Sequence, residues 1–516
     1  MPGPAMRKPG DARAADAMTL RLFNTLTGQL DALEPADGKA LRMYACGPTV
    51  YDYGHIGNFR TFLQIDILRR FLRLTGTPVR HVMNITDVDD KIIRNSAEAG
   101  VPIGEYTARY VEAFFEDLEA LRIERPEQIA RATEHIPQMA ALVEKLARAG
   151  AAYKAEDGSW YFRLKAFPEY GKLSKKDLSG MEDGARVDVD EYEKDSARDF
   201  ALWKAAKPGE TSWETAIGRG RPGWHIECSA MAMEYLGESF DLHCGGEDLM
   251  FPHHENEIAQ SETATHKPFA RHWMHVRFLL VDGRKMSKSE GNFYTPRDLL
   301  LKGFKASAIR LALVSVPYRR PFNFTFDSLV DATNAIDRLR TFQARLTTTK
   351  WPPGAQHGAR GEDEGISQSV ETARKDFYAA LSNDLNTAEA LAAIFELVRK
   401  VNTLADSGGL FESDSRAILS ILQDFDAVFD VIEDRDAEPT RRALEWAEQA
   451  GRMGDVAPEL LAAQSLGDEA IEALVAERTA AKQARNFARA DEIRKELAEK
   501  GVVLEDSKDG VRWKRK

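Results

Sequence analysis

The spacing of apolar residues changes sharply around residue 48. Apolar and polar residues alternate over 41–45 and Gly47-Pro48 follows, which predicts a strand that ends in a tight loop. Apolar residues then recur every three or four positions over 59–72, which predicts an amphipathic helix that begins near Gly57. Residues 78–85 form another strand-like run. A strand, a helix and a strand in this order indicate an α/β protein with a parallel sheet.

The rest of the chain shows several different patterns. Helical periodicity runs over about 105–150, whereas about 151–220 is a mixture rich in Gly, Lys and Asp that indicates an insertion. The α/β pattern resumes at Trp224. Residues 351–366 are rich in Pro, Gly and charge without periodicity, which predicts a linker, and the helical patterns beyond them predict a bundle.

These patterns divide the chain into six regions. We expect a disordered extension over 1–17, a parallel α/β domain over 18–310 that contains the insertion, a connecting region over 311–350, the linker, a helical bundle over 367–465 and a small C-terminal domain over 466–516. A length of 516 residues is sufficient for several packed cores.

Composition narrows the class of protein. No apolar run approaches the roughly 18 residues of a membrane span, and the first 17 residues lack the apolar stretch of a secretion signal. Three cysteines in so long a chain cannot form a disulfide framework and favour a reducing compartment, so we expect a cytoplasmic protein. The net charge of −12 gives no sign of nucleic-acid binding, so any such surface must be local.

Four residues of the α/β region have the side chains of a tetrahedral zinc site. His253 and Glu257 are four positions apart and would lie on one side of a helix. Cys46 and Cys228 would supply two thiolates. Each cysteine alone is better explained as a small buried apolar residue. Polar residues crowd the apolar sequence around Cys228, however, and this favours a metal.

Ligand identity stays open on these residues alone. Cys244 and His254 are rival ligands, and a pair of His254 with Glu257 at i, i+3 is also geometrically possible. We therefore expect a metal ion, with Cys46, Cys228, His253 and Glu257 as the preferred ligands.

Two short motifs suit nucleotide phosphates. His55-Ile56-Gly57-Asn58 lies where a loop becomes a helix, and a helix N-terminus offers free N–H groups and partial positive charge. A simple N-cap explains these four residues equally well. The run 285–292 places Lys285 and Lys288 on a loop that contains Ser and Gly. Two lysines suit the charge of a pyrophosphate leaving group, although a solvated charged turn is the competing interpretation.

Both motifs, in this order around a parallel α/β unit, resemble the signature of class I aminoacyl-tRNA synthetases. Four longer strings resemble the cysteinyl-tRNA synthetases, namely CGPTVYD at 46–52, NITDVDDK at 84–91, PGWHIECS at 222–229 and GGEDLMFPHHENE at 245–257. The resemblance extends from about residue 20 to the C-terminus. It implies a Rossmann-type catalytic domain, a tRNA stem-contact region over 311–350 and tRNA-binding domains beyond the linker.

The resemblance implies a reaction in two steps. Cysteine attacks the α-phosphorus of ATP to give cysteinyl-adenylate and pyrophosphate, and the cysteinyl group then passes to the 3′ end of tRNA(Cys). One zinc ion per chain would bind the substrate thiolate, which serine cannot match because its hydroxyl has a far higher pKa. Magnesium is expected with ATP. The insertion is short for an editing domain, in agreement with a site that needs no editing.

The resemblance also implies a role for each matching residue. It places His55 and Asn58 on the ATP phosphates, Lys288 with Lys285 at the leaving pyrophosphate, Asp248 at the adenylate ribose, and Thr86, Trp224 and His243 around the substrate cysteine. The class motif usually ends in histidine, whereas Asn58 stands here. An amide can donate a hydrogen bond to phosphate but carries no charge, and we expect the activity to survive.

The C-terminal region favours an RNA partner. Lys482, Arg485 and Arg489 recur on one helical face near Phe487, and the chain closes with Trp513-Lys514-Arg515-Lys516. Basic and aromatic groups together suit backbone contacts and base stacking. Interleaved acidic residues make a solvated helix of mixed charge an equal alternative for this segment.

Two other functions compete with this interpretation. A ligase that joins cysteine to an amino-sugar would share the catalytic half but lack the anticodon-binding tail, which is present here. A catalytically silent paralogue is expected to have lost a phosphate-binding lysine or a metal ligand, and neither loss is seen. We expect a monomer that binds ATP, L-cysteine and tRNA and does not bind a membrane.

Overall fold

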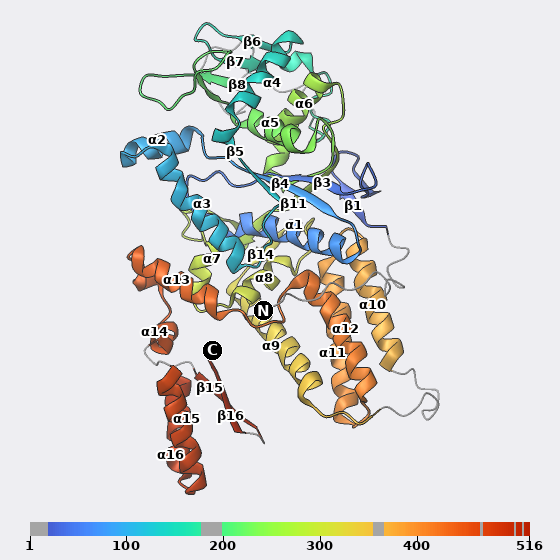
Figure 1. Ribbon diagram of the computed structural model, residues 1–516, viewed down its shortest axis with the longest axis vertical. Coiled ribbons are helices and arrows are strands. Elements are labelled where there is room, and N and C mark those ends of the chain that lie inside the picture. Colours follow the sequence, from blue (N-terminus) through green and yellow to red (C-terminus); the bar gives the residue numbers. More distant parts are fainter. Residues whose placement is uncertain are drawn as a thin grey trace. The chain divides into compact units, whose positions relative to one another are not determined.

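The computed structural model describes residues 19–176, 199–353, 366–464, 468–499, 502–507 and 510–515. The extension expected over 1–17, most of the expected linker, part of the expected insertion and Lys516 lie outside these residues. The chain divides into two compact units, each of which combines separate segments (Figure 1). The first unit contains the residues up to Phe293 and Arg310–Glu433, and the second contains Tyr294–Ile309 and the residues from Asp434 onward.

A five-stranded parallel sheet is the centre of the first unit. Its strands are β3 (Leu41–Ala45), β4 (Val79–Ile85), β5 (Gln128–Arg131), β10 (Phe240–Gly246) and β11 (Ala270–Val276). Their order is β11-β10-β3-β4-β5, and all neighbours are parallel. From the middle of the sheet, β3, β4 and β5 follow one another in one direction and β10 and β11 in the other, so the strand order reverses between β3 and β10. This is the arrangement of a doubly wound, Rossmann-type sheet.

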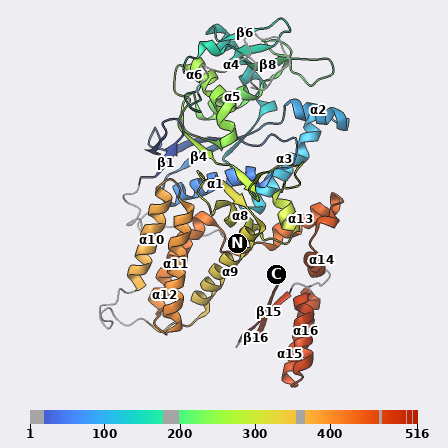
Figure 2. The ribbon, with the colours of Figure 1, turned by 180° about the vertical axis from the view of Figure 1, so that it is seen from behind.

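Helices cover both faces of this sheet, as a buried parallel sheet requires. Helix α1 (Ile56–Leu74) lies on one face and α5 (Trp224–Leu236) on the other, as Figures 1 and 2 show. The other helices of this region are α2 (Asp90–Ala99), α3 (Ile103–Ala120), α4 (Ile136–Arg148) and α6 (Glu255–Thr265).

The helical periodicity expected over about 105–150 corresponds to α3 and α4, but a strand separates the two helices. Strand β5 lies between α3 and α4 and forms the edge of the parallel sheet. It has only four residues, too few for a period of two to stand out against the flanking helical patterns. Its place in the sheet depends on pairing with β4, which is a contact between distant segments.

An antiparallel sheet interrupts the parallel fold in the region of the expected insertion. Its strands are β6 (Ala152–Lys154), β7 (Trp160–Phe162), β8 (Phe200–Ala205) and β9 (Gly220–Pro222), which pair in chain order. The segment after β7 is tied to α6 by the buried carboxylate of Glu255. This carboxylate accepts the backbone N–H groups of Gly171 and Ser174, both at 2.9 Å.

Smaller elements and a helical bundle complete the first unit. The strands are β1 (Arg21–Asn24), β2 (Gln29–Ala32), β12 (Leu279–Val281), β13 (Arg284–Lys285) and β14 (Phe322–Phe324). The bundle contains α9 (Phe326–Thr348), α10 (Ile366–Ser382), α11 (Thr387–Asp406) and α12 (Glu412–Phe429). The predicted fold class, a Rossmann-type domain with an insertion followed by helices, is confirmed.

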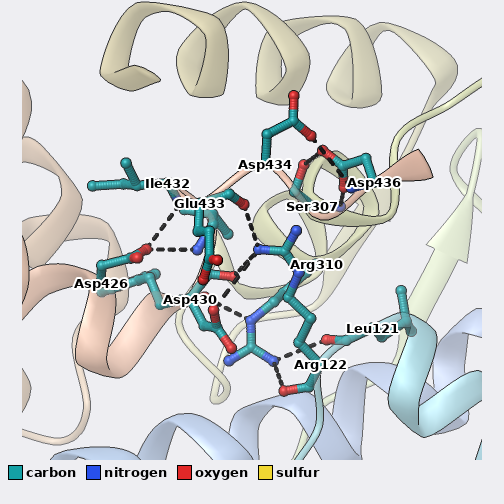
Figure 3. Close-up of polar contacts among 12 residues, drawn as sticks. Leu121, Arg122, Ser307, Arg310, Asp426, Asp430, Ile432, Glu433, Asp434 and Asp436 are labelled. Carbon is teal, nitrogen blue, oxygen red and sulfur yellow. Dashed lines mark hydrogen bonds and ion pairs between the residues drawn. The ribbon is translucent and has the colours of Figure 1, made fainter. Parts of the chain in front are cut away.

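Three arginines hold the C-terminal end of α12, and Figure 3 shows two of them, Arg122 and Arg310. A helix leaves its last carbonyl groups without partners inside the helix. Together with Arg340, these arginines donate to every backbone carbonyl over 428–433, at 2.6–3.4 Å. Their positive charge also opposes the negative end of the helix dipole.

Arg310 connects this end of α12 to α1. The side chain is fully buried and donates from Nη2 to Oδ2 of Asp66 on α1 at 2.6 Å. Its Nη1 donates to the carbonyls of Leu121 and Arg122 at 3.0 and 3.1 Å. Burial raises the pKa of Asp66, but the charges of Arg310 and Arg70 outweigh burial and lower it. Each buried charge therefore has several partners: Asp66 faces Arg310 and Arg70, and Arg310 also donates to backbone carbonyls.

The second unit is mostly helical. Its helices are α7 (Pro296–Leu301), the start of α8 (Ala306–Val314), α13 (Ala437–Gln449), α14 (Pro458–Gln464), α15 (Asp468–Gln483) and α16 (Phe487–Glu499). Asp436 accepts the backbone N–H and the hydroxyl of Ser307 at 2.8 and 2.7 Å (Figure 3). The strands β15 (Val502–Ser507) and β16 (Gly510–Arg515) form a hairpin. Among the described residues, no helix is both long and apolar enough to cross a membrane.

Substitution of Arg310 by Met should destabilise the first unit by about 3–5 kcal/mol, because it leaves Asp66 and several carbonyls buried without their partner. Urea unfolding followed by tryptophan fluorescence measures the loss. Arg399→Met is the matched control, since Arg399 forms an exposed pair with Glu396. Equal losses in the two variants would contradict a structural role for the Arg310 contacts.

Candidate active site and metal centre

The chemically distinctive residues gather where the strand order of the parallel sheet reverses. Cys46 directly follows β3, and Ala45 pairs with Cys244 on β10. Ligands of doubly wound sheets bind at the carboxyl ends of the strands beside such a reversal. Gly47 lets the chain after β3 pass close to the end of β4, because a Cβ at this position would lie 1.8 Å from the carbonyl oxygen of Asn84.

Four predicted donor groups converge at this place. Ligand atoms of Cys46, Cys228, His253 and Glu257 all lie within 4.8 Å of one another, and all four residues are buried. The two sulfur atoms are 3.9 Å apart, and Nε2 of His253 is 3.0 Å from Oε1 of Glu257. Two sulfurs, an imidazole and a carboxylate are a donor set that could hold a metal ion.

A second donor group overlaps the first. Cys46 and Glu257 also lie with His243 and His254 inside the same limit of 4.8 Å. Nε2 of His254 is 3.3 Å from the sulfur of Cys46 and 4.0 Å from Oε1 of Glu257. The rival ligand Cys244 belongs to neither group among the described residues, although it is buried nearby.

The charges of the first group are strongly interdependent. Burial raises the pKa of Cys228, but hydrogen bonding from Cys46 and the charge of His253 outweigh burial and hold it at about 6. Burial raises the pKa of Glu257, but His243 and His253 lower it to about 2. Burial lowers the pKa of His253, but the charges of Cys228 and Glu257 raise it to about 10. Thiolate and carboxylate are the forms that bind a metal.

The two candidate histidine ligands have different outer contacts, which sequence reasoning missed. Nδ1 of His253 lies 2.9 Å from Nδ1 of His225, and Nδ1 of His254 lies 2.8 Å from Nε2 of His275. His275 in turn lies 2.9 Å from the hydroxyl of Thr25. Such partners orient a ligand ring. The signal in the sequence was a local excess of histidine, since seven of the eleven histidines lie over residues 225–275. Five of these seven meet at this one site, namely His225, His243, His253, His254 and His275.

The residues expected around a substrate cysteine border the donor cluster. Trp224 is partly exposed and stacks on His253 with ring centroids 4.3 Å apart. Thr86 is buried and donates to Glu227 at 2.9 Å. His243 is fully buried, with Nε2 at 2.8 Å from Oε2 of Glu257, so the structure brings it into the donor cluster itself.

The first phosphate motif forms the N-terminal cap of α1. The N–H of Asn58 donates to Nδ1 of His55 at 3.2 Å, and the N–H of His55 donates to Oδ1 of Asn58 at 3.0 Å. This reciprocal cap orients both side chains at the helix start. Burial lowers the pKa of His55, and the nearby carboxylate of Asp248 opposes the shift. Asp248 lies in the turn Glu247–Leu249, which directly follows β10.

The second phosphate motif lies against the first. Met286 lies over Gly57, because a Cβ at Gly57 would be 3.3 Å from Cε of Met286. The ammonium group of Lys288 forms an ion pair with Asp52, a residue that sequence reasoning had not singled out. Lys285 ends β13 and is exposed. The structure thus packs the two motifs against each other beyond the end of β3, and Asp248 lies beyond the end of the neighbouring strand β10.

Comparison with known proteins agrees with this geometry. Family models match residues 32–334 as a tRNA synthetases class I (C) catalytic domain, 376–432 as a DALR domain and 467–513 as a cysteinyl-tRNA ligase anticodon binding domain. A solved methionyl-tRNA synthetase of Mycobacterium tuberculosis, in complex with methionyl-adenylate, has a similar fold. Its TM-score is 0.56 at 18% identity, over 81% of this chain and 94% of that one. Fold and site define a class I aminoacyl-tRNA synthetase.

Two relatives are similar over almost their whole length. The cysteine–tRNA ligase of Koribacter versatilis is 58% identical, over 97% of this chain and 100% of the relative. The cysteine–tRNA ligase of Solibacter usitatus is 52% identical with the same coverage. The chain belongs to the cysteine–tRNA ligase family.

The two overlapping donor groups make different predictions. If the first group is the metal site, Cys228→Ser and His253→Ala should each lower metal affinity by more than about tenfold, whereas His254→Ala should change it less. Metal content after dialysis against a chelator, measured by mass spectrometry, gives the comparison. Cys244→Ser is the matched control, because it removes a buried thiol outside both groups. Greater loss in His254→Ala than in His253→Ala would contradict the first group.

Proposed function

We propose that this protein is an L-cysteine–tRNA(Cys) ligase that uses ATP. The observation that carries the proposal is the buried group of two cysteines, a histidine and a glutamate. One of its cysteines, Cys46, lies on the chain that continues from β3 into the first phosphate motif, on which the second motif packs. A carboxylate oxygen of cysteine would attack the α-phosphorus of ATP and pyrophosphate would leave. A ribose hydroxyl of the tRNA would then attack the carbonyl carbon, and AMP would leave.

We propose zinc as the metal, held by Cys46, Cys228, His253 and Glu257. The donor set fits zinc, which accepts thiolate, imidazole and carboxylate in one tetrahedral site. Bound zinc would supply a preference for a thiolate ligand over a hydroxyl. This preference discriminates cysteine from serine by ligand chemistry, which pocket size alone could not do for two side chains so similar in size.

The substrate amino acid would lie beside the donor group. We propose that Trp224 packs against it with its partly exposed ring, while Thr86 offers a hydroxyl held by Glu227. His243 would act through Glu257, whose second carboxylate oxygen it contacts at 2.8 Å. That contact keeps Oε1 of Glu257 toward Cys46 and His253.

ATP would lie between the two phosphate motifs, with magnesium on its phosphates. We propose that His55 and Asn58 contact the phosphates and that Asp248 contacts the ribose. The oxygen of Asn58 is used in the cap of α1, so its NH₂ group remains as the donor toward a phosphate. Lys288, with Lys285 in the same loop, would compensate the charge of the leaving pyrophosphate.

The described C-terminal residues support an RNA partner mainly through Phe487. Its side chain is 62% exposed at the start of α16. Arg489 is less available than expected, because it pairs with Glu477 and Glu492, each at 2.8 Å. We propose that α15 and α16 bind the anticodon region of tRNA(Cys). We also propose that the ligase acts in the cytoplasm as a monomer.

The purified protein should transfer labelled cysteine to total tRNA in the presence of ATP. Glu257→Gln should lower the preference for cysteine over serine by more than about tenfold, because it removes a metal ligand and the partner of two histidines. Competition between the two amino acids in the charging reaction gives the preference, and Cys244→Ser is the control.

Two results would overturn the proposal in different ways. Adenylate formation without charging of any tRNA would favour the ligase that joins cysteine to an amino-sugar. Absence of adenylate formation from the metal-loaded protein would favour a catalytically silent paralogue.

Phe487→Ala should raise the KM for tRNA about tenfold, the loss expected for one stacked base. Exchange of pyrophosphate into ATP, which needs cysteine but no tRNA, should keep its rate, because Phe487 belongs to the second unit and the donor group to the first. An unchanged KM for tRNA would exclude Phe487 from the RNA contact.

A further inference from the structure

The lysine loop over 285–293 is held in shape by its own residues. The carboxamide of Asn292 accepts the N–H of Ser287 at 2.8 Å and donates to the carbonyl of Lys285 at 3.1 Å. Asn292 itself is buried. The hydroxyls of Ser287 and Ser289 are 2.7 Å apart. The loop's own side chains therefore give it a defined form, and Lys288 has a defined place on it.

This loop lies directly on the first phosphate motif. Met286 lies over Gly57, as its 3.3 Å approach to a Cβ there requires. The ring of Phe293 meets the ring of His55 edge to face, with centroids 5.3 Å apart and an interplanar angle of 89°. These apolar contacts bring the loop to the place where we propose that the ATP phosphates bind.

In this position Lys288 has an anionic partner within the protein. Its ammonium group pairs with Oδ2 of Asp52 and lies 5.1 Å from the ring centroid of Phe293. The other oxygen of Asp52 accepts the N–H of Tyr53 at 2.8 Å, which orients the carboxylate. Asp52 lies on the loop between β3 and α1, three residues before His55.

We propose that Asp52 is a positioning residue for Lys288, which it holds until the phosphates of ATP replace its carboxylate. The inference rests on the proposed function, since it deepens the role of the same lysine. Asp52 would keep the loop docked on the nucleotide motif and would keep a positive charge ready near the phosphates. It would not contact the reacting atoms.

The exposure of the pair supports an exchange of partners. The side chains of Lys288 and Asp52 are 61% and 29% exposed, and an exposed ion pair is weak because water screens it. A nucleoside triphosphate carries several negative charges and can displace the single carboxylate of Asp52 from Lys288. Since Asp52 and ATP compete for one ammonium group, Asp52 lowers the apparent affinity for ATP while it orders the empty loop.

Asp52→Asn removes the competitor without a change in size. In cysteine-dependent exchange of pyrophosphate into ATP, the KM for ATP should fall by about two- to fivefold, the range expected for an exposed ion pair. The kcat should be nearly unchanged, and the difference in KM should shrink as salt is added. Asp52→Glu should restore the KM of the natural chain. Glu238→Gln is the matched control, since Glu238 is a similarly exposed carboxylate that pairs with Lys145 and Lys267 elsewhere.

The loop supplies a second readout that needs no catalysis. Trypsin can cut after Lys288, and mass spectrometry can follow that cut alone. Without nucleotide, the cut should be faster in Asp52→Asn than in the natural chain or in Glu238→Gln. With saturating ATP, the rates should become equal.

Distinct results would overturn the inference. A higher KM for ATP, or a kcat at least about tenfold lower, would mean that Asp52 contacts the substrates directly. Equal rates of cleavage without nucleotide would mean that the ion pair does not hold the loop. If the natural chain shows no exchange activity, the proposed function fails instead, and the cleavage comparison still decides whether Asp52 holds Lys288.

Discussion

The parallel pairing of β3 with β10 is the constraint on which the site depends. It sets Ala45 beside Cys244, so Cys46 leaves β3 next to the segment that leads from β10 to His253 and Glu257. The start of α1 follows β3 at the same edge of the sheet. One register between two strands therefore fixes the relation of the donor group to the nucleotide motif, and a shift of this register would separate them.

Periodicity in the sequence was sufficient for the parallel fold, the helical bundle and the start of α1, because α1 and the bundle helices, at 17–23 residues, are long enough for a helical period to show. It failed for β5, whose four residues become a strand only by pairing with β4. The sequence also has no local pattern that predicts the grouping of 294–309 with the residues from 434 onward, since contacts between distant segments produce this grouping.

For the site, residue type was informative and geometry was not accessible. Two cysteines, His253 and Glu257 were predicted as ligands from their chemistry, and the structure brings them together. Sequence spacing could not separate His253 from His254, because both adjacent rings reach Glu257, at 3.0 and 4.0 Å. The partners of these rings, His225 and His275, come from different elements, and their roles arise only when those elements pack.

The arginine contacts at the end of α12 have a consequence for how this sequence can vary. The guanidinium groups of Arg122, Arg310 and Arg340 bind backbone carbonyls over 428–433, which every amino acid possesses. These contacts therefore do not restrict which amino acids occupy residues 428–433. The arginines themselves cannot be replaced by lysine, because a lysine ammonium cannot present the same planar, divergent set of N–H groups. In related chains, the contact between the helical bundle and α1 should be marked by these three arginines, whereas the residues that correspond to 428–433 can differ.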